Sequence, residues 1–347
     1  MFARTTTRQA RLLRRIVTRQ NCLRGSSIQT PNIAHSAAFS TTRSQNAVPR
    51  KVPGTFAKAR FSKMEVPQLA FWKSMARPPL VVDTEPDEFF RTTHVYVDLA
   101  VADKAGWRST LKDPPHSLSY ATLHYAAAMI MNGPVGPAYQ IALHIYHTLV
   151  TLNYPPSIIT VIRLAFMRNK LGQPQFSLAE EKFAALLRRK DDPNACAMQG
   201  IILASKLTPE TDKQALQWFR TAASLGGEEP GAWDWQASCA MEMGKVYLRM
   251  NNTNKANEIW KYCAERLDVA EGAWLYSTLL DHSDPKKYYW VCRAAVSGIQ
   301  DAAREMARLE GSRTEIEGVG GAGAWDAKSA GVLQREWEAI AGDRALV

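Results

Sequence analysis

Three histidines lie at spacings that could bring imidazoles to one metal ion. His144 and His147 are three positions apart, so on one helix they would share a face, and His124 lies on the segment expected to pair with that helix. A metal site also needs a third and fourth ligand and groups that orient the imidazoles. No cysteine or carboxylate has a spacing that supplies them. We therefore interpret these histidines as helix-contact or surface residues and predict no metal site.

A second pattern could bind a dinucleotide. Gly318, Gly320 and Gly323 match G-x-G-x-x-G, and Asp343 follows at the distance expected for a ribose-binding acid. That motif requires a buried strand before it and a βαβ unit around it. Here the charged run 313–317 precedes the glycines, and the stretch from there to Val347 is too short for such a unit. The sequence therefore predicts a hinge at this place, and no cofactor.

The cysteines and serines give no catalytic pattern. The separations between Cys196, Cys239, Cys263 and Cys292 match no zinc template and no paired-disulfide arrangement. We expect free thiols, with Cys263 acting as a small core residue. No G-x-S-x-G motif is present. We expect the protein not to be an enzyme.

The elements that position these residues are helices in pairs. Apolar residues recur at i, i+3 and i+4, and short Pro, Gly, Asn or Asp segments separate the stretches. Start signals include Ser177 with Glu180, which forms a capping-box pattern, and Thr208 before Pro209. Helices joined by such short loops pack antiparallel. The expected pairs are 117–132 with 136–153, 157–171 with 177–190, 193–206 with 208–226, 235–251 with 253–267, and 270–282 with 284–297.

The second helices of the later pairs repeat one another. The pattern of the segment 213–226 returns around Trp260 and, after a shorter interval, again around Trp290. We expect a bulky aromatic to fill the groove to the next repeat, small residues one turn later to allow close approach, and glycine to end the helix. The residues assigned to this packing are Ala215, Trp218, Phe219, Ala222, Ala223, Gly226, Trp260, Cys263, Ala264, Trp290, Ala294, Ala295 and Gly298.

The segment A-x2-W-F-x2-A-A-x2-G at 215–226 resembles the second helix of a Sel1-like repeat, the longer relative of the tetratricopeptide repeat. The match is partial at 290–309, where Lys287 replaces the expected alanine, and one loop, 228–235, looks enlarged. The resemblance covers about a third of the chain. It implies a superhelix whose concave face binds other proteins. In size and layout the chain also resembles fungal mitochondrial tetratricopeptide proteins that assist cytochrome c oxidase assembly.

The positive charge of the chain is confined to its first part. Of the formal net charge of +10, residues 1–64 contribute thirteen basic side chains and no acid, which leaves −3 for the remainder. Arg8, Arg11, Arg14, Arg15 and Arg19 alternate with apolar residues at helical spacing, as in a mitochondrial presequence. The alternative is a basic arm that binds RNA or anionic lipid. The remainder of the chain, with a net charge of −3, is close to neutral, which argues against a nucleic-acid-binding face.

Five regions follow from these patterns. They are a targeting presequence at 1–45, a Pro-rich, partly ordered segment at 46–116, a helical-repeat domain at 117–310, a Gly-rich linker at 311–324, and a C-terminal capping helix at 325–347. The expected fold is all-α, an α-solenoid of antiparallel helix pairs. No apolar run is long enough for a transmembrane segment.

The sequence thus predicts a non-catalytic adaptor in the mitochondrial matrix, with protein partners in the groove of its repeats. Peripheral association with the inner membrane is the alternative location. By resemblance, its role would be assembly of an inner-membrane respiratory complex such as cytochrome c oxidase. The alternative is an RNA-facing helical repeat in mitochondrial translation or on the mitochondrial ribosome. The basic and aromatic run 286–290 could stack RNA bases, but its place in the repeat favours packing for Trp290.

Overall fold

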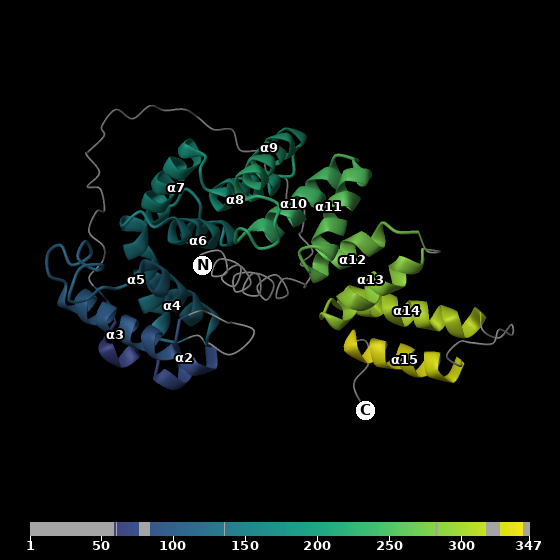
Figure 1. The fold of residues 1–347 in the computed structure, drawn as a ribbon, viewed down its shortest axis with the longest axis horizontal. Coiled ribbons are helices and arrows are strands. Elements are labelled where there is room, and N and C mark those ends of the chain that lie inside the picture. Colours follow the sequence, from purple (N-terminus) through teal and green to yellow (C-terminus); the bar gives the residue numbers. More distant parts are fainter. Residues whose placement is uncertain are drawn as a thin grey trace, which may run out of the picture. The chain divides into compact units, whose positions relative to one another are not determined.

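The computed structural model describes residues 59, 61–75, 84–134, 136–281, 284–316 and 327–342 (Figure 1). All regular structure in these residues is helical, which confirms the predicted all-α fold class. None of the described helices is both long and apolar enough to cross a membrane. The presequence at 1–45, Gly318, Gly320, Gly323 and Asp343 lie outside the described residues.

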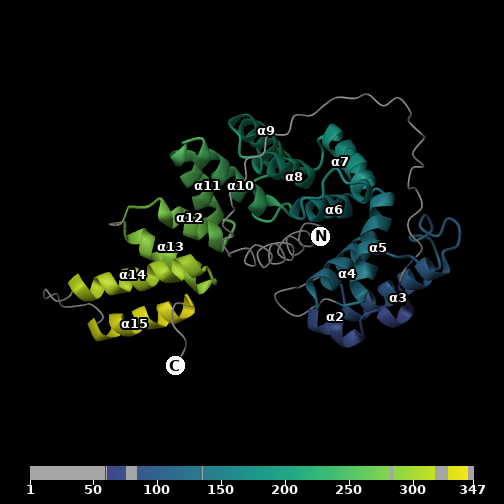
Figure 2. The same cartoon turned by 180° about the vertical axis from the view of Figure 1, so that it is seen from behind.

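The chain divides into two compact units, at a point within one helix. The described part of the first in sequence, which ends at Val161, holds the 3-10 turn η1 (Lys63–Glu65) and helices α2 (Leu69–Met75), α3 (Pro86–Ala102), α4 (Tyr120–Asn132), α5 (Ala138–Thr151) and the first half of α6 (Pro155–Met167). Helix α3 packs against both α2 and α4, and α4 packs against α5 (Figure 2).

Helix α3 was not predicted from the sequence. A Pro-rich, partly ordered segment was expected at residues 46–116, but Pro86 is the first residue of a 17-residue helix. Proline is compatible with the first helical turn because the N–H groups of that turn have no intrahelical acceptor. Asp87 and Glu88 follow in the same turn, where the helix dipole favours acids. Pro86 therefore marks the start of α3, and no proline interrupts its interior.

The segment between α3 and α4 covers the helices without forming one. Trp107, Leu111 and Leu118 are buried, with exposed fractions of 5%, 0% and 1%. The ring of Trp107 stacks on His144 of α5 at a centroid distance of 6.2 Å. Apolar side chains therefore hold this segment against the helices of the first unit.

The second unit begins at Ile162 and holds most of the predicted pairs. Its helices are the rest of α6, α7 (Ser177–Arg189), α8 (Pro193–Ala204), α9 (Pro209–Gly226), α10 (Gln236–Arg249), α11 (Thr253–Glu265), α12 (Ala270–Thr278), α13 (Pro285–Val296), α14 (Gln300–Ile316) and α15 (Ala327–Ile340), with the 3-10 turn η2 (Pro174–Phe176) before α7. From α7 onward each helix packs mainly against the next, and α8 also contacts α10. Contacts between neighbours in sequence are characteristic of repeat proteins.

Side-chain caps fix where several of these helices start. Asp192, Thr208, Asn252 and Asp284 each accept a backbone hydrogen bond from the first turn of the helix that follows. The capping box predicted at Ser177 does not form, because η2 leads directly into α7 and gives Ser177 a helical conformation. Its hydroxyl donates to the Pro174 carbonyl instead.

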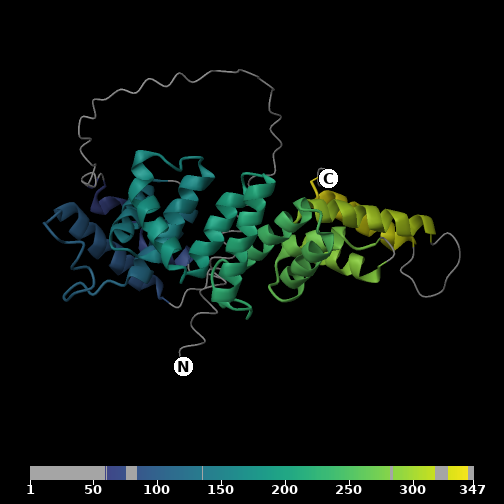
Figure 3. The same cartoon turned by 90° about the horizontal axis from the view of Figure 1, so that it is seen from above.

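The C-terminal boundaries also differ from the prediction. Helix α14 continues to Ile316, so the predicted start of the linker at residue 311 is too early. Gly311 is tolerated within α14, close to the side chain of Gln334. Helix α15, within the predicted capping segment 325–347, lies beside α14 (Figure 3).

Candidate interaction face

The first contact that shapes the repeat is between α8 and α9. A Cβ atom added to Gly200 would lie 2.4 Å from Cε1 of Phe219, so the ring packs directly on the backbone of α8. Phe219 is fully buried. The next pair repeats this contact, because a Cβ on Gly244 of α10 would lie 2.2 Å from Nε1 of Trp260, which is 1% exposed. Glycine is required at both places because any side chain would occupy the position of the ring.

The third pair differs from the first two. In the register of the second helices, Val291 of α13 stands where Phe219 and Trp260 stand in α9 and α11. Val291 is fully buried, and the ring of Tyr276 meets Trp290 edge-on at a centroid distance of 5.8 Å. The aromatic contact between α12 and α13 is therefore made by the residue before Val291.

The predicted packing residues fall into three groups by exposure. Buried are Ala215, Phe219, Ala222, Trp260, Cys263, Ala264, Trp290, Ala294 and Ala295; half-buried are Trp218, Ala223 and Gly226; and exposed is Gly298. In α9 the aromatic that contacts the glycine is Phe219, whereas Trp218 lies at the surface with Lys190 5.8 Å from its ring centroid. Gly298 has a φ of +92° directly after α13, which suits a helix stop.

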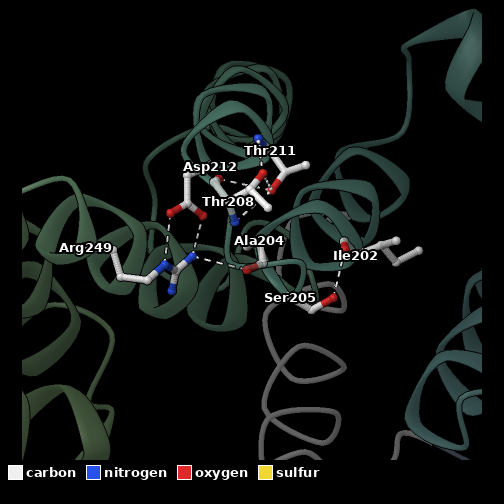
Figure 4. A network of polar contacts seen from close by, with 7 residues as sticks. All are labelled: Ile202, Ala204, Ser205, Thr208, Thr211, Asp212 and Arg249. Atoms are coloured by element: carbon white, nitrogen blue, oxygen red, sulfur yellow. Dashed lines mark hydrogen bonds and ion pairs between the residues drawn. The ribbon is translucent and has the colours of Figure 1, made fainter. Parts of the chain in front are cut away.

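A polar clamp joins three helices at one end of these pairs (Figure 4). Arg249, near the end of α10, donates from Nε and Nη2 to the carboxylate of Asp212 on α9, at 3.0 and 2.5 Å. Its Nη2 also donates to the Ala204 carbonyl at the end of α8, at 3.2 Å. The Asp212 side chain is only 5% exposed. A forked guanidinium therefore satisfies a buried carboxylate and a helix-end carbonyl together.

The first helices of successive pairs leave polar and aromatic side chains at the surface. Lys245 of α10 lies 3.0 Å from Glu242 on its own helix and 3.0 Å from Glu271 of α12, with about a third of each side chain exposed. Trp274 lies one turn beyond Glu271 on α12 and is half-buried. We call Glu242, Lys245, Glu271 and Trp274 the first-helix face.

The enlarged loop between α9 and α10 is ordered by its own polar contacts. The Gln236 side chain accepts from the Gly231 amide at 2.8 Å and donates to the Gly227 and Glu229 carbonyls. The Trp233 ring lies on Gly226, where an added Cβ would come within 2.3 Å of it. The Trp235 amide donates to Asn194 at 3.0 Å, which ties the loop to α8.

Arg163 of α6 lies over this loop. Its guanidinium carbon is 5.0 Å from the centroid of the Trp235 ring, a cation–π distance. Arg163 is half-buried, and burial lowers the pKa of its guanidinium. Sequence reasoning missed Arg163, Trp235 and the Arg249 clamp. The density of tryptophan in the enlarged loop was the one available signal, since an isolated arginine on a helix indicates nothing.

The histidines considered as metal ligands have separate partners. His124 shares a hydrogen bond of 2.9 Å with Ser157, and His144 shares one of 2.7 Å with the Tyr96 hydroxyl. Desolvation lowers the pKa of both imidazoles to about 4, and for His144 the charge of Arg108 adds to it. Among the described residues, no three His, Cys, Asp or Glu side chains are grouped to hold a metal ion.

The cysteines behave as small apolar residues in the packing. Cys196, Cys239 and Cys263 are buried free thiols, and Cys292 is half-buried. Burial raises the pKa of Cys239, and the neighbouring thiols of Cys263 and Cys196 add to the shift. A thiol with a raised pKa is a poor nucleophile at neutral pH.

Three of the five residues in the run 286–290 contact other parts of the second unit. Lys287 is 7% exposed, and its Nζ donates to the Leu280 carbonyl just after α12, which explains why lysine replaces alanine there. The Tyr288 hydroxyl donates to the buried carboxylate of Glu310. Trp290 is packed between α12 and α13, while Lys286, Tyr288 and Tyr289 remain exposed.

The described fold defines the class of the protein as an all-α helical-repeat protein of antiparallel helix pairs. No family model matches the chain, and no curated protein matches it. Among solved structures, the chain is similar to a Sel1 repeat protein from Oxalobacter formigenes, at 17% identity and a TM-score of 0.49 over 74% of this chain and 99% of that one. Helix-pair folds serve many functions, so function is inferred from this chain's own residues.

Proposed function

We propose that this protein is a non-catalytic helical-repeat adaptor that binds protein partners on its first-helix face. The supporting observation is how the side chains are divided between packing and surface. The aromatic and small residues of the repeat are used between helices, as at Gly244 and Trp260. The first helices keep Lys245, two glutamates and Trp274 at the surface. An aromatic beside charged groups of both signs is a suitable anchor for a protein ligand.

The polar residues inside the described helices support a structural use. His124 with Ser157, His144 with Tyr96, and Asp212 with Arg249 each join different helices. Each of these groups thus has a packing role that accounts for its burial. Such a distribution favours an adaptor over an enzyme, in which titratable groups converge on one pocket.

We further propose that the adaptor acts in the mitochondrial matrix or at the matrix side of the inner membrane. The support is the basic, acid-free amphipathic leader, which suits import driven by an inside-negative potential. Within that compartment, assembly of an inner-membrane respiratory complex such as cytochrome c oxidase is the proposed role.

The RNA-facing alternative receives less support from the structure. Within the basic and aromatic run, Lys287 is bound to the end of α12, and Tyr288 is bound to Glu310. These contacts occupy the Lys287 ammonium and the Tyr288 hydroxyl, whereas Lys286 and Tyr289 of the same run are exposed. The first-helix face also carries two glutamates, which would repel a polyanion.

Site-specific photocrosslinking in intact mitochondria tests the proposal. A photoreactive phenylalanine analogue replaces Trp274 on the first-helix face and, as the matched control, Gln217 on the exposed side of α9. We expect discrete crosslinked proteins from position 274 and much weaker ones from 217. Equal patterns from both positions would contradict a partner on the first-helix face. Ribosomal RNA recovered from position 274 would instead favour the translation alternative.

A further inference from the structure

No carboxylate among the described residues neutralises the charge of Arg163. Its guanidinium is half-buried, and it forms no ion pair with any carboxylate in the described part of the chain. Its neighbour is the ring of Trp235, 5.0 Å away. A partly desolvated cation that meets only an aromatic face keeps most of its hydrogen-bonding capacity unused, because an arginine fork has five donors. A carboxylate arriving there would gain a charge-assisted hydrogen bond.

The aromatic platform under Arg163 is held in place before any ligand binds. Trp235 is 9% exposed, and its backbone amide donates to Asn194 of α8 at 3.0 Å. It is the residue directly before α10, whose N-terminus has no side-chain cap. Three helices therefore contribute to this place. Arg163 comes from α6, the Trp235 ring lies at the start of α10, and Asn194, which fixes the Trp235 backbone, belongs to α8. Pre-organisation of this kind lowers the entropy cost of binding.

The residue directly before Trp235 in the chain is acidic. Asp234 is half-buried, and no described cation pairs with its carboxyl group. Burial, together with the charge of Asp192, raises the pKa of Asp234 to about 6. Asp192 itself is engaged in capping α8 through the Ala195 amide. The two aspartates disfavour a polyanionic ligand, because they would repel it.

We propose that Arg163, Trp235 and Asp234 form a docking site for a protein segment that carries an acidic and a basic side chain. The partner's carboxylate would bind the Arg163 guanidinium over the Trp235 ring, and its cation would bind the Asp234 carboxylate. We call this the Arg163–Trp235 site. It deepens the proposed adaptor function, on which it rests, by giving the charge pattern of the segment that is recognised.

Selection from a library of random linear peptides displayed on phage tests the site. The full chain is the bait, after the library has been depleted on the Arg163→Gln chain, which carries the same basic leader. We expect the remaining peptides to share an Asp or Glu near a Lys or Arg. Each should bind Arg163→Gln roughly tenfold to a hundredfold more weakly, as expected for a lost charge-assisted hydrogen bond. Arg188→Gln is the control, because Arg188 is exposed on α7.

A double-mutant cycle assigns the contact. Replacing the peptide's acid by its amide should weaken binding to the natural chain and have little further effect on Arg163→Gln. Asp234→Asn should weaken binding through the peptide's base. Thermal unfolding confirms that each variant folds. The site would be overturned if no peptide remained after depletion, or if the selected peptides carried no acidic residue. Equal losses of peptide affinity in Arg163→Gln and Arg188→Gln would also overturn it. Crosslinking at Trp274 reports on the adaptor function separately, since that residue is not part of the site.

Discussion

Glycine at two equivalent positions determines how closely the paired helices approach. Gly200 and Gly244 receive the rings of Phe219 and Trp260, and an added methyl group would overlap either ring. Neither glycine has an unusual backbone angle, so the requirement is for space. The cost of any side chain there is the cost of moving a buried aromatic.

Gly244→Ala should destabilise the second unit by about 2 kcal/mol, because the Cβ displaces Trp260 by more than the helix gains in propensity. We expect the thermal midpoint to fall by roughly 4–8 °C, measured by far-UV circular dichroism. Gly331→Ala in α15 is the control, since nothing lies within 4 Å of its added Cβ. Gly244→Ala with Trp260→Phe should recover part of the loss. If Gly244→Ala is as stable as the control variant, the contact with Trp260 is not tight.

Buried histidines give the protein a defined response to acid. His124 is 3% exposed, and its pKa is lowered to about 4 from an ordinary value of 6.5. The unfolded chain therefore binds a proton that the folded chain does not as the pH falls below 6.5. Stability is lost through that window until the folded pKa is reached.

His124→Asn should flatten this dependence by about 3 kcal/mol between pH 7 and pH 4, while lowering stability at pH 8 through lost ring packing. Urea unfolding across that pH range measures it. Two other groups also make stability depend on pH. The pKa of His144 is lowered like that of His124, while the raised pKa of Asp234 has the opposite effect on stability. Both groups are present in the natural chain and in the variant, so the difference between the two pH curves isolates His124. Parallel pH curves would show that His124 is not protected from protonation.

At the scale of elements, residues next to each helix determine where it starts. Contacts between helices instead depend on side chains that are distant in sequence. The caps at Asp192, Thr208 and Asn252 begin the helices near the predicted positions. Helix α3 was not predicted, because the prolines of residues 46–116 indicated a partly ordered segment, although only Pro86 lies at an end of the helix. The Arg249 clamp joins residues up to 45 positions apart, a separation at which sequence spacing carries no information.

Arg249→Gln should cost about 1–3 kcal/mol, because it leaves the Asp212 carboxylate buried without its cation. Arg189→Gln is the matched control, since the pair Arg189–Asp191 is more than half exposed on both sides and should contribute less than about 0.5 kcal/mol. Urea unfolding compares the two. Adding Asp212→Asn to Arg249→Gln should restore part of the stability. Equal effects of the two arginine variants would mean that water reaches Asp212 freely.

At the scale of the whole molecule, charge and packing are separated along the sequence. The leader, residues 1–64, has thirteen basic side chains and no acid, while the remainder is weakly acidic. The isoelectric point near 9.4 therefore reflects residues 1–64 and not the rest of the chain. Within the second unit, each helix depends mainly on its sequence neighbours, as in other repeat proteins.

Replacing Arg8, Arg11, Arg14, Arg15 and Arg19 by glutamine should abolish import into isolated mitochondria, because the leader loses the charge on which the membrane potential acts. Protease protection of the radiolabelled chain measures import. The same five positions replaced by lysine are the control and should import. Import of the glutamine variant would exclude residues 8–19 as the targeting signal.

The sequence by itself determined the fold class and most helix boundaries, because apolar periodicity, caps and helix stops act over a few residues. It also indicated the repeat, since Ala215, Phe219 and Gly226 share one helix with fixed spacing. Only the tertiary structure showed that Phe219 is the ring against Gly200, that Tyr276 meets Trp290, and that Arg163 meets Trp235. Those facts depend on which helices touch. Contacts between helices are set by shape and burial over the assembled unit, which no local pattern encodes.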